Sequence, residues 1–291
     1  MASVNEIRQR IEAVEQTRKI TGAMELVSST RMRRVMSHLE YNREYFAHIR
    51  RTMREILAST EGISHPYLEG RPEGRRTYIV IAGDKGLCGA YNANVLALAE
   101  KELEEHPGSS LITIGNTAES HFRRRGIIPD ITMYGIVQDP TMRAARRISR
   151  EIMMLFDQGL TDDIHVVFTS FYGVSKNRPT EFRLLPIKLH DYDDVTDAEL
   201  GELLYEPSPQ DVFEQLIPQY IMGLVFGVMV QAYAAEHYSR MNAMHASTQN
   251  AGDMLKSLTT QYNMARQSAI TNELSEITGA AEILRRQQFE G

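Results

Sequence analysis

Cysteine, long apolar runs and surplus positive charge are all scarce in this sequence. Cys88 is the single cysteine among 291 residues, so the chain cannot form an internal disulfide and is not a disulfide-rich secreted domain. The most apolar stretch, 217–235, is interrupted by proline, glycine and glutamine, so a membrane-spanning helix is not expected. The start of the chain lacks the apolar stretch of a signal peptide. The net charge of −6 disfavours a nucleic-acid binder.

Proline is confined to the middle of the chain. None of the ten prolines precedes Pro66 and none follows Pro218. Because proline in a helix interior costs about 3 kcal/mol, proline-free segments are where long helices can form. We expect one helix from about Ser3 to about Ser59 and another from Gln219 to near the end, reaching roughly 85 and 100 Å. A compact domain does not enclose helices of that length, so each would have to stabilise the other.

Apolar or small residues recur alternately three and four positions apart in the C-terminal segment, the spacing of a coiled-coil seam. The members are Met241, Met244, Thr248, Ala251, Leu255, Leu258, Tyr262, Ala265 and Ala269; after a one-residue slip the pattern resumes at Ile270, Leu274, Ile277, Ala281 and Leu284. The N-terminal segment begins in the same way at Val4, Ile7, Ile11 and Val14, loses its regularity around Arg18–Thr21, and continues at Met24, Val27, Met32, Val35 and Leu39.

The composition of this seam favours an intramolecular pair. A homodimeric zipper prefers Leu, Ile or Val at nearly every seam position, whereas Thr248, Ala251 and Ala265 are polar or small. An antiparallel pair of the two terminal helices is more plausible, since the middle of the chain can return the second helix beside the first. Two amphipathic helices folded over a globular core remain the alternative.

Short apolar runs alternate with helical patterns in the middle of the chain, which predicts a doubly wound, Rossmann-like α/β domain. Expected strands are Thr77–Ala82, Leu111–Ile114, Ile164–Thr169 and Phe182–Leu189; expected helices are Asn94–Glu105, Thr117–Arg125 and Thr141–Asp157. Ser208 and Pro209 resemble the N-cap and first residue of the last helix, which Pro218 would kink or restart. The predicted organisation is an N-terminal long helix (1–60), a central α/β domain (75–190), a linker (191–208) and a C-terminal long helix (209–291).

Motifs that carry catalytic chemistry are missing. Gly83–Gly89 follows a predicted strand, where α/β folds bind phosphates, but its G-x-x-G-x-x-G spacing is not the dinucleotide fingerprint, and no phosphate loop occurs elsewhere. We interpret it as a tight turn with left-handed glycine, in which Cys88 packs as a small residue. The nine histidines form no metal-ligand pattern. The acid pairs Asp162-Asp163 and Asp193-Asp194 are interpreted as solvated loops. No catalytic residue, cofactor or metal ion is expected.

Two polar clusters lie on the long helices. One is the basic group Arg31, Arg33 and Arg34, which is suited to acidic loops of a partner. The other is Arg266-Gln267, followed by Thr271 and Glu273, whose side chains suit multiple hydrogen bonds to a partner. From the pattern alone, an ordinary solvated helix face is the favoured explanation of either cluster.

Ordered segments at both ends and in the centre resemble the gamma subunit of F-type ATP synthases over essentially the full chain. They are Glu6–Arg8 to Thr17–Thr21, Ala23–Glu25 with Met32-Arg33, Asp84–Gly89 with Asn92, Leu204–Pro207, and Tyr262–Thr271 continuing to Glu273 and Ile277. The resemblance implies a non-catalytic rotor shaft: an antiparallel coiled coil within a ring of alpha and beta subunits, and an α/β domain beside the epsilon subunit and the membrane c ring.

The resemblance also implies particular contact residues. Contacts with beta subunits would be made by Met24, Arg266, Gln267, Thr271 and Glu273, and contact with the c ring by Tyr205 and Glu206. The chain would reach the membrane only through the c ring, as a peripheral subunit on the cytoplasmic side of a bacterial cell membrane. Two other hypotheses remain: a nucleotide- or phosphate-binding α/β enzyme carrying long helices, and a coiled-coil adaptor unconnected to energy conversion.

Overall fold

The protein contains two long helices and a five-stranded sheet with shorter helices. The computed structural model describes residues 3–60, 65–71, 74–136, 138–171, 173, 177–187 and 205–289. Its elements are α1 (Val4–Ser59), α2 (Pro66–Glu69), β1 (Arg76–Ile81), α3 (Tyr91–Glu105), β2 (Ser110–Ile114), α4 (Asn116–Arg124), β3 (Ile131–Met133), α5 (Met142–Asp157), β4 (Asp163–Phe171), β5 (Asn177–Leu185) and α6 (Pro209–Phe289). Both proline-free ends are therefore long helices, as predicted.

Two compact units divide the chain. The first, here called the coil unit, consists of residues 1–27 and 242–291. The second, the α/β unit, consists of residues 28–241. Each long helix contributes to both units. Most of the predicted linker, 191–204, and with it Asp193-Asp194, lies outside the described residues.

The sheet of the α/β unit has the strand order β3-β2-β1-β4-β5. β1 lies parallel to β2 and β4, β3 lies parallel to β2, and β5 runs antiparallel to β4 at one edge. β3 was not predicted, because its three residues are too few to show a period. The strand expected at Phe182–Leu189 instead spans Asn177–Leu185, and Pro186 follows its last residue. Pro179 is tolerated within it because β5 is an edge strand.

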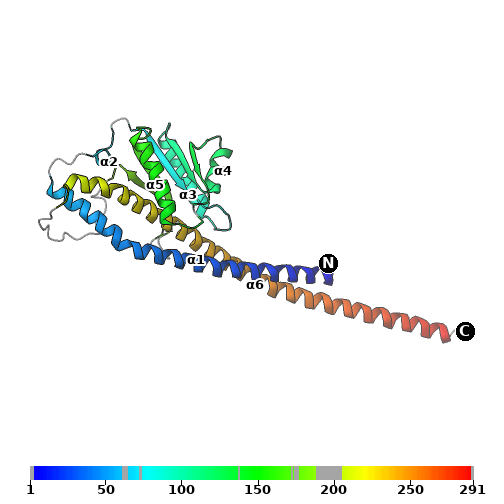
Figure 1. Cartoon of the computed structure of the whole chain (residues 1–291). Coiled ribbons are helices and arrows are strands. Elements are labelled where there is room, and N and C mark those ends of the chain that lie inside the picture. Colours follow the sequence, from blue (N-terminus) through cyan, green and yellow to red (C-terminus); the bar gives the residue numbers. More distant parts are fainter. Residues whose placement is uncertain are drawn as a thin grey trace. The chain divides into compact units, whose positions relative to one another are not determined.

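Helices cover both faces of this sheet (Figure 1). Alternate residues of β1 point to opposite faces, as a strand requires. Tyr78 and Val80 pack with α3 and α4, whereas Ile79 and Ile81 pack in the larger core formed with α5, α6 and part of α1. The predicted layered α/β architecture is confirmed.

The first part of α6 is a core helix. Ser208 caps it, accepting a hydrogen bond at 3.1 Å from the backbone N–H of Asp211, and the helix begins at Pro209 and continues through Pro218. Neither a restart nor an end occurs at Pro218. A window of α6 is long and apolar enough to cross a membrane, but 61% of it is buried inside the protein. Its apolar character is therefore explained by the core of the α/β unit.

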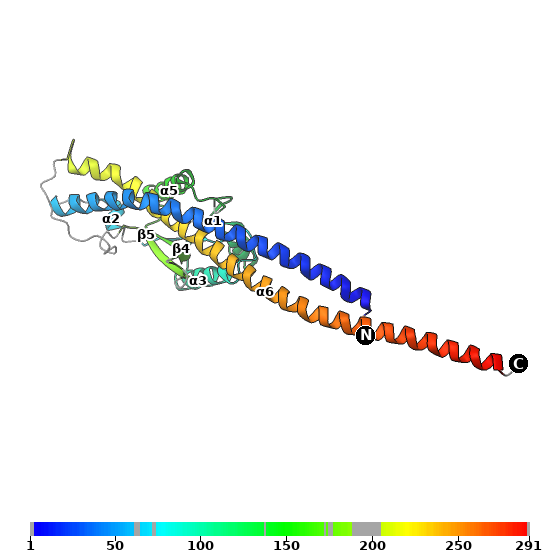
Figure 2. The same ribbon diagram turned by 90° about the horizontal axis from the view of Figure 1, so that it is seen from below.

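The coil unit is an antiparallel helix pair (Figure 2). The hydroxyls of Thr21 and Thr248 lie 2.7 Å apart, and His245 Nδ1 lies 2.9 Å from Glu25 Oε1. Residue numbers rise along α1 as they fall along α6, which defines the antiparallel direction. The seam predicted on α6 is confirmed from Met241 to Ala269, because those nine positions are the buried or half-buried ones at heptad spacing.

The seam predicted on α1 needs a correction between Val14 and Met32. Thr21 and Ser28 are buried at this helix's contact face, seven residues apart, whereas Val27 is 50% exposed. The heptad of Ile7 and Val14 thus continues through these two polar residues to Val35, which is buried as predicted, whereas Val27 lies on another face of the helix.

Within the coil unit, α6 continues past the start of α1 (Figures 1 and 2). Counting both helices at equal rise from the Thr21–Thr248 contact, Val4 lies opposite about residue 265. Residues 271–281 are all exposed. The predicted resumption of the seam at Ile270, Leu274 and Ile277 is therefore wrong within the chain, because α1 supplies no facing helix there.

Candidate functional site

The Gly83–Gly89 turn is a strand-to-helix connection, as predicted. Leu87 and Gly89 adopt left-handed φ values of 61° and 56°. Asn92 at the start of α3 accepts a hydrogen bond from the backbone N–H of Gly83 at 2.8 Å and holds the turn closed. Cys88 is buried in it, and burial raises the pKa of its thiol, so it remains a neutral packing residue.

A carboxylate of α6 occupies the place where an α/β fold would hold a phosphate. A Cβ atom on Gly83 would lie 3.0 Å from Cδ of Glu236, closer than an ordinary van der Waals contact, so a larger residue would press on the Glu236 carboxylate. Arg240 donates to Glu236 Oε1 at 2.5 Å and to the carbonyl of Gly86 at 3.4 Å. Burial raises the pKa of Glu236, although Arg240 opposes the shift. The Gly83–Gly89 turn is therefore bound to α6, and the Glu236 carboxylate would repel a phosphate at this position.

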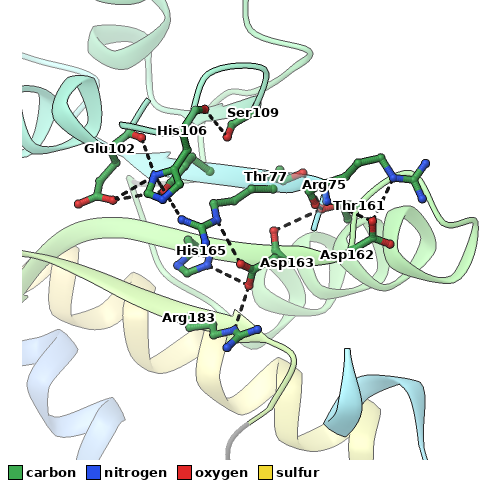
Figure 3. A network of polar contacts seen from close by, with 12 residues as sticks. Arg75, Thr77, Glu102, His106, Ser109, Thr161, Asp162, Asp163, His165 and Arg183 are labelled. Atoms are coloured by element: carbon green, nitrogen blue, oxygen red, sulfur yellow. Dashed lines mark hydrogen bonds and ion pairs between the residues drawn. The ribbon is translucent and has the colours of Figure 1, made fainter. Parts of the chain in front are cut away.

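Asp162 and Asp163 are buried, contrary to the prediction of a solvated loop (Figure 3). Arg75 donates to Asp162 Oδ2 at 3.0 Å from its guanidinium and at 3.1 Å from its backbone. Burial alone would raise the pKa of Asp162, but these hydrogen bonds outweigh it and lower the pKa. The reason is strand register: β1 and β4 begin side by side, with Arg76 opposite Asp163.

His165 extends this network along β4. Its Nε2 lies 2.9 Å from Asp163 Oδ1, and its Nδ1 contacts Glu181 on β5. Burial lowers the pKa of His165, but hydrogen bonds to both carboxylates outweigh burial and leave the pKa raised. Arg183 Nε, 2.9 Å from Asp163 Oδ1, adds a second cation. The network pairs its charges internally and joins three strands, which is the arrangement of a structural cluster.

Metal chemistry finds no support in the part of the chain that the structure describes. Its His, Cys, Asp and Glu side chains form no group of three or more that could hold a metal ion.

Arg266, Gln267, Thr271 and Glu273 are all exposed on α6, near the level where α1 begins. Helical periodicity puts them on two faces rather than one. Gln267 and Thr271 are four residues apart on one face, and the Thr271 hydroxyl donates to the Gln267 carbonyl at 2.9 Å. Arg266 and Glu273 are seven residues apart on another, beside the seam. The four side chains therefore point in two directions from the helix.

An apolar stripe lies between those two faces. Ile270, Leu274 and Ile277 follow the 4,3 spacing of a single helix face, and Leu274 and Ile277 are 60% and 67% exposed. Apolar side chains in such a row on an unpaired helix mark a surface that another protein covers. The sequence pattern found these residues but assigned them to the wrong partner helix.

Met24 is half-buried on α1 and is flanked on its own helix face by Ile20 and Val27. Ile20 is 59% exposed, so the three form a second apolar surface on the coil unit. In the antiparallel register Met24 lies about 30 Å along the coil from Arg266. The coil thus offers two contact levels, and the sequence reading missed Ile20 by assigning Met24 and Val27 to the seam.

Tyr205 and Glu206 lie just before α6 in the α/β unit. Tyr205 packs half-buried against the core, and burial, followed by the charge of Glu55, raises the pKa of its hydroxyl. Glu206 is exposed. The pair therefore combines an anchored ring with a free carboxylate, a suitable arrangement for a surface contact.

Comparison with known proteins gives consistent similarities. The family described as ATP synthase matches residues 3–284. The ATP synthase gamma chain of Alkaliphilus metalliredigens is 37% identical over 285 residues, covering 97% of this chain and 99% of the relative. That of Acetivibrio thermocellus is 36% identical, covering 98% and 100%.

Solved structures share the fold. A chain of the Euglena gracilis mitochondrial ATP synthase, in a structure of its OSCP, F1 and c ring, superposes with a TM-score of 0.67 at 16% identity, covering 98% of this chain and 95% of that one. A chain of the Tetrahymena thermophila central stalk and c ring gives 0.57 at 22% identity, covering 78% and 98%. At these identities the likeness concerns the fold alone.

Proposed function

The chain belongs to the ATP synthase gamma-chain family, and we propose that it works as the central rotor stalk of a rotary ATP synthase. The observation that carries this proposal is the coil unit, an antiparallel helix pair whose α6 continues alone with an exposed apolar stripe. The chain is a non-catalytic subunit. Its one phosphate-site-like turn is filled by Glu236, which agrees with that assignment.

The coil unit is suited to turn inside a ring of three alpha and three beta subunits. Its surface differs around the axis, because the apolar stripe, the Arg266–Glu273 pair and the Gln267–Thr271 pair lie on different faces. Each beta subunit would therefore meet a different surface at any moment. Rotation then changes which conformation of each catalytic site is favoured, because a partner shifts a conformational equilibrium only through unequal affinity for its states.

The residues expected to touch beta subunits fit two contact levels. The first level lies near the start of α1. There, Arg266 and Glu273 would contact a loop of one beta subunit, and Gln267 and Thr271 would contact a loop of another. At the second level, about 30 Å along the coil, Met24 would contact a beta subunit together with Ile20 and Val27. Exposed arginine and glutamine form hydrogen bonds that hold a rotor position. Breaking these bonds does not require a large apolar interface to separate, so the position is also readily released.

Contact with loops of the c ring would be made by Tyr205 and Glu206, with the epsilon subunit beside the α/β unit. The chain belongs to a membrane-associated complex. We further propose that it is peripheral, on the cytoplasmic side of a bacterial cell membrane, and touches the membrane only through the c ring. The bacterial sources of the similar gamma chains support this placement.

The test is the reconstituted complex with alpha and beta subunits. The double substitution Arg266→Ala with Gln267→Ala should lower ATP turnover of the complex by about tenfold, or about 1.4 kcal/mol. The melting temperature of the isolated chain should not change, because both side chains are exposed. Gln261→Ala, an exposed change on the same helix, is the control. Parental turnover by the double variant, or an equal loss in the control, would count against the proposed contacts.

A further inference from the structure

Helix α5 carries a row of arginines that the rotor function leaves without a role. Arg143, Arg146, Arg147 and Arg150 follow the i, i+3, i+4, i+7 spacing of one helix face, and all four are exposed. The opposite face is buried in the core through Ala145, Ile148, Ser149, Ile152 and Phe156. The arginine stripe, as these four residues are called below, extends about 10 Å along the surface of the α/β unit.

The stripe is not neutralised within the described chain. Among the described residues, none of its four guanidinium groups has a hydrogen-bond or ion-pair partner. Two arginines at the end of α4, on the other face of the sheet, differ, because Arg123 pairs with Glu119 and Arg125 with Glu100. A concentrated positive surface on a chain of net charge −6 is an exception that needs a counter-charge.

Other residues that could contribute to an interface lie at both ends of the arginine stripe. Met154, four residues after Arg150 on the same face, is 42% exposed. At the other end, Asp139 lies just before α5, and Asp139, Arg31 and Arg34 all influence the pKa of Tyr233. The first turn of α5 therefore lies in the same region as the basic group of α1. Arginine with exposed methionine is the composition of a protein interface.

We propose that the arginine stripe of α5 is a docking surface for an acidic segment of another protein. Arginine, and not lysine, supplies all four charges, and its planar guanidinium binds carboxylates through two parallel hydrogen bonds. The surface does not depend on the rotor contacts of the coil unit.

A membrane surface fits this face poorly. A helix that lies on lipid inserts its apolar face among the acyl chains. The apolar face of α5 is already buried in the protein core, so only charge is left to hold lipid. Nucleic acid is disfavoured by the negative charge of the whole chain.

The first experiment measures binding of the full-length chain to a helical peptide with glutamates on one face. Binding should weaken about tenfold or more in the variant Arg143→Glu with Arg147→Glu, and more salt should weaken binding to the parent. A matched lysine peptide should bind the reversed variant instead. The control, Lys101→Glu with Arg124→Glu, makes the same charge change on the other helical layer and should keep the affinity for the acidic peptide.

Three results would overturn the proposal: no peptide binding by the parent, an equal loss in the control variant, or stripe-dependent binding only to phosphatidylglycerol vesicles. The second experiment places a photo-reactive residue at Arg147 in the purified complex and maps the cross-linked peptide. A carboxylate-rich protein segment supports the proposal, and cross-links only to lipid or to segments without acidic residues contradict it.

Discussion

Buried charged residues of the α/β unit take their partners from distant parts of the sequence. Arg75 pairs with Asp162, and Glu236 with Arg240 lies against the Gly83–Gly89 turn. A sequence can reveal an acidic pair such as Asp162-Asp163, but it does not reveal the strand register that places arginines opposite. Those acids were therefore predicted to be solvated when they are buried. Cys88 was predicted correctly, because a lone thiol within a glycine-rich turn has few alternatives to packing.

His237 provides a pH prediction at the scale of one residue. Burial, followed by the charges of Arg240 and Arg31, lowers the pKa of His237 to about 4 from 6.5. The unfolded chain therefore takes up this proton below pH 6.5, and the folded chain does so only near pH 4. The free energy of unfolding should therefore be about 3 kcal/mol lower at pH 4 than above pH 6.5. Chemical denaturation of the parent and of His237→Gln at both pH values measures it. An equal pH dependence in the variant would contradict the assignment.

At the scale of single elements, helix pairing is the feature that the sequence predicted best. Part of it was nevertheless predicted wrongly. The α6 seam from Met241 to Ala269 was predicted residue by residue, because its spacing is regular there. On α1 the polar Thr21 and Ser28 hid an unbroken heptad, since apolar neighbours seemed to offer a better continuation. Hydrophobic pattern alone does not show that a threonine finds a hydroxyl partner on the facing helix. The strands β3 and β5 were less predictable for a related reason, since short or edge strands carry little periodic signal.

Two helical glycines should respond oppositely to the same substitution. Gly22 in α1 has open space around an added Cβ atom, so Gly22→Ala should stabilise the chain by about 1 kcal/mol through helix propensity. Gly223 in α6 lies against Phe46 of α1, and an added Cβ atom would overlap the Phe46 ring. Gly223→Ala should therefore destabilise by about 1–3 kcal/mol through overpacking. Thermal melting of both variants tests the pair; a destabilised Gly22→Ala would show that the glycine is needed for something other than the helix.

At the scale of the whole molecule, the sequence identified the fold class and the family more reliably than the contact surfaces. Proline placement predicted the two long helices, and ordered segments along the entire chain carried the family resemblance. Surfaces were harder to predict, because exposed residues have no partner within the chain to fix a pattern. The arginine stripe of α5 shows this: its spacing is visible in the sequence, but only the buried opposite face shows that it points outward.

The central claim is that this chain turns within its complex. The most direct measurement attaches a visible probe through Lys101→Cys, an exposed position on α3, to a surface-immobilised complex with alpha and beta subunits. The buried Cys88 should not compete for the label. Adding ATP should produce rotation of the probe in one direction that stops when ATP is removed. A complex that hydrolyses ATP at its normal rate while the probe stays still would contradict the account.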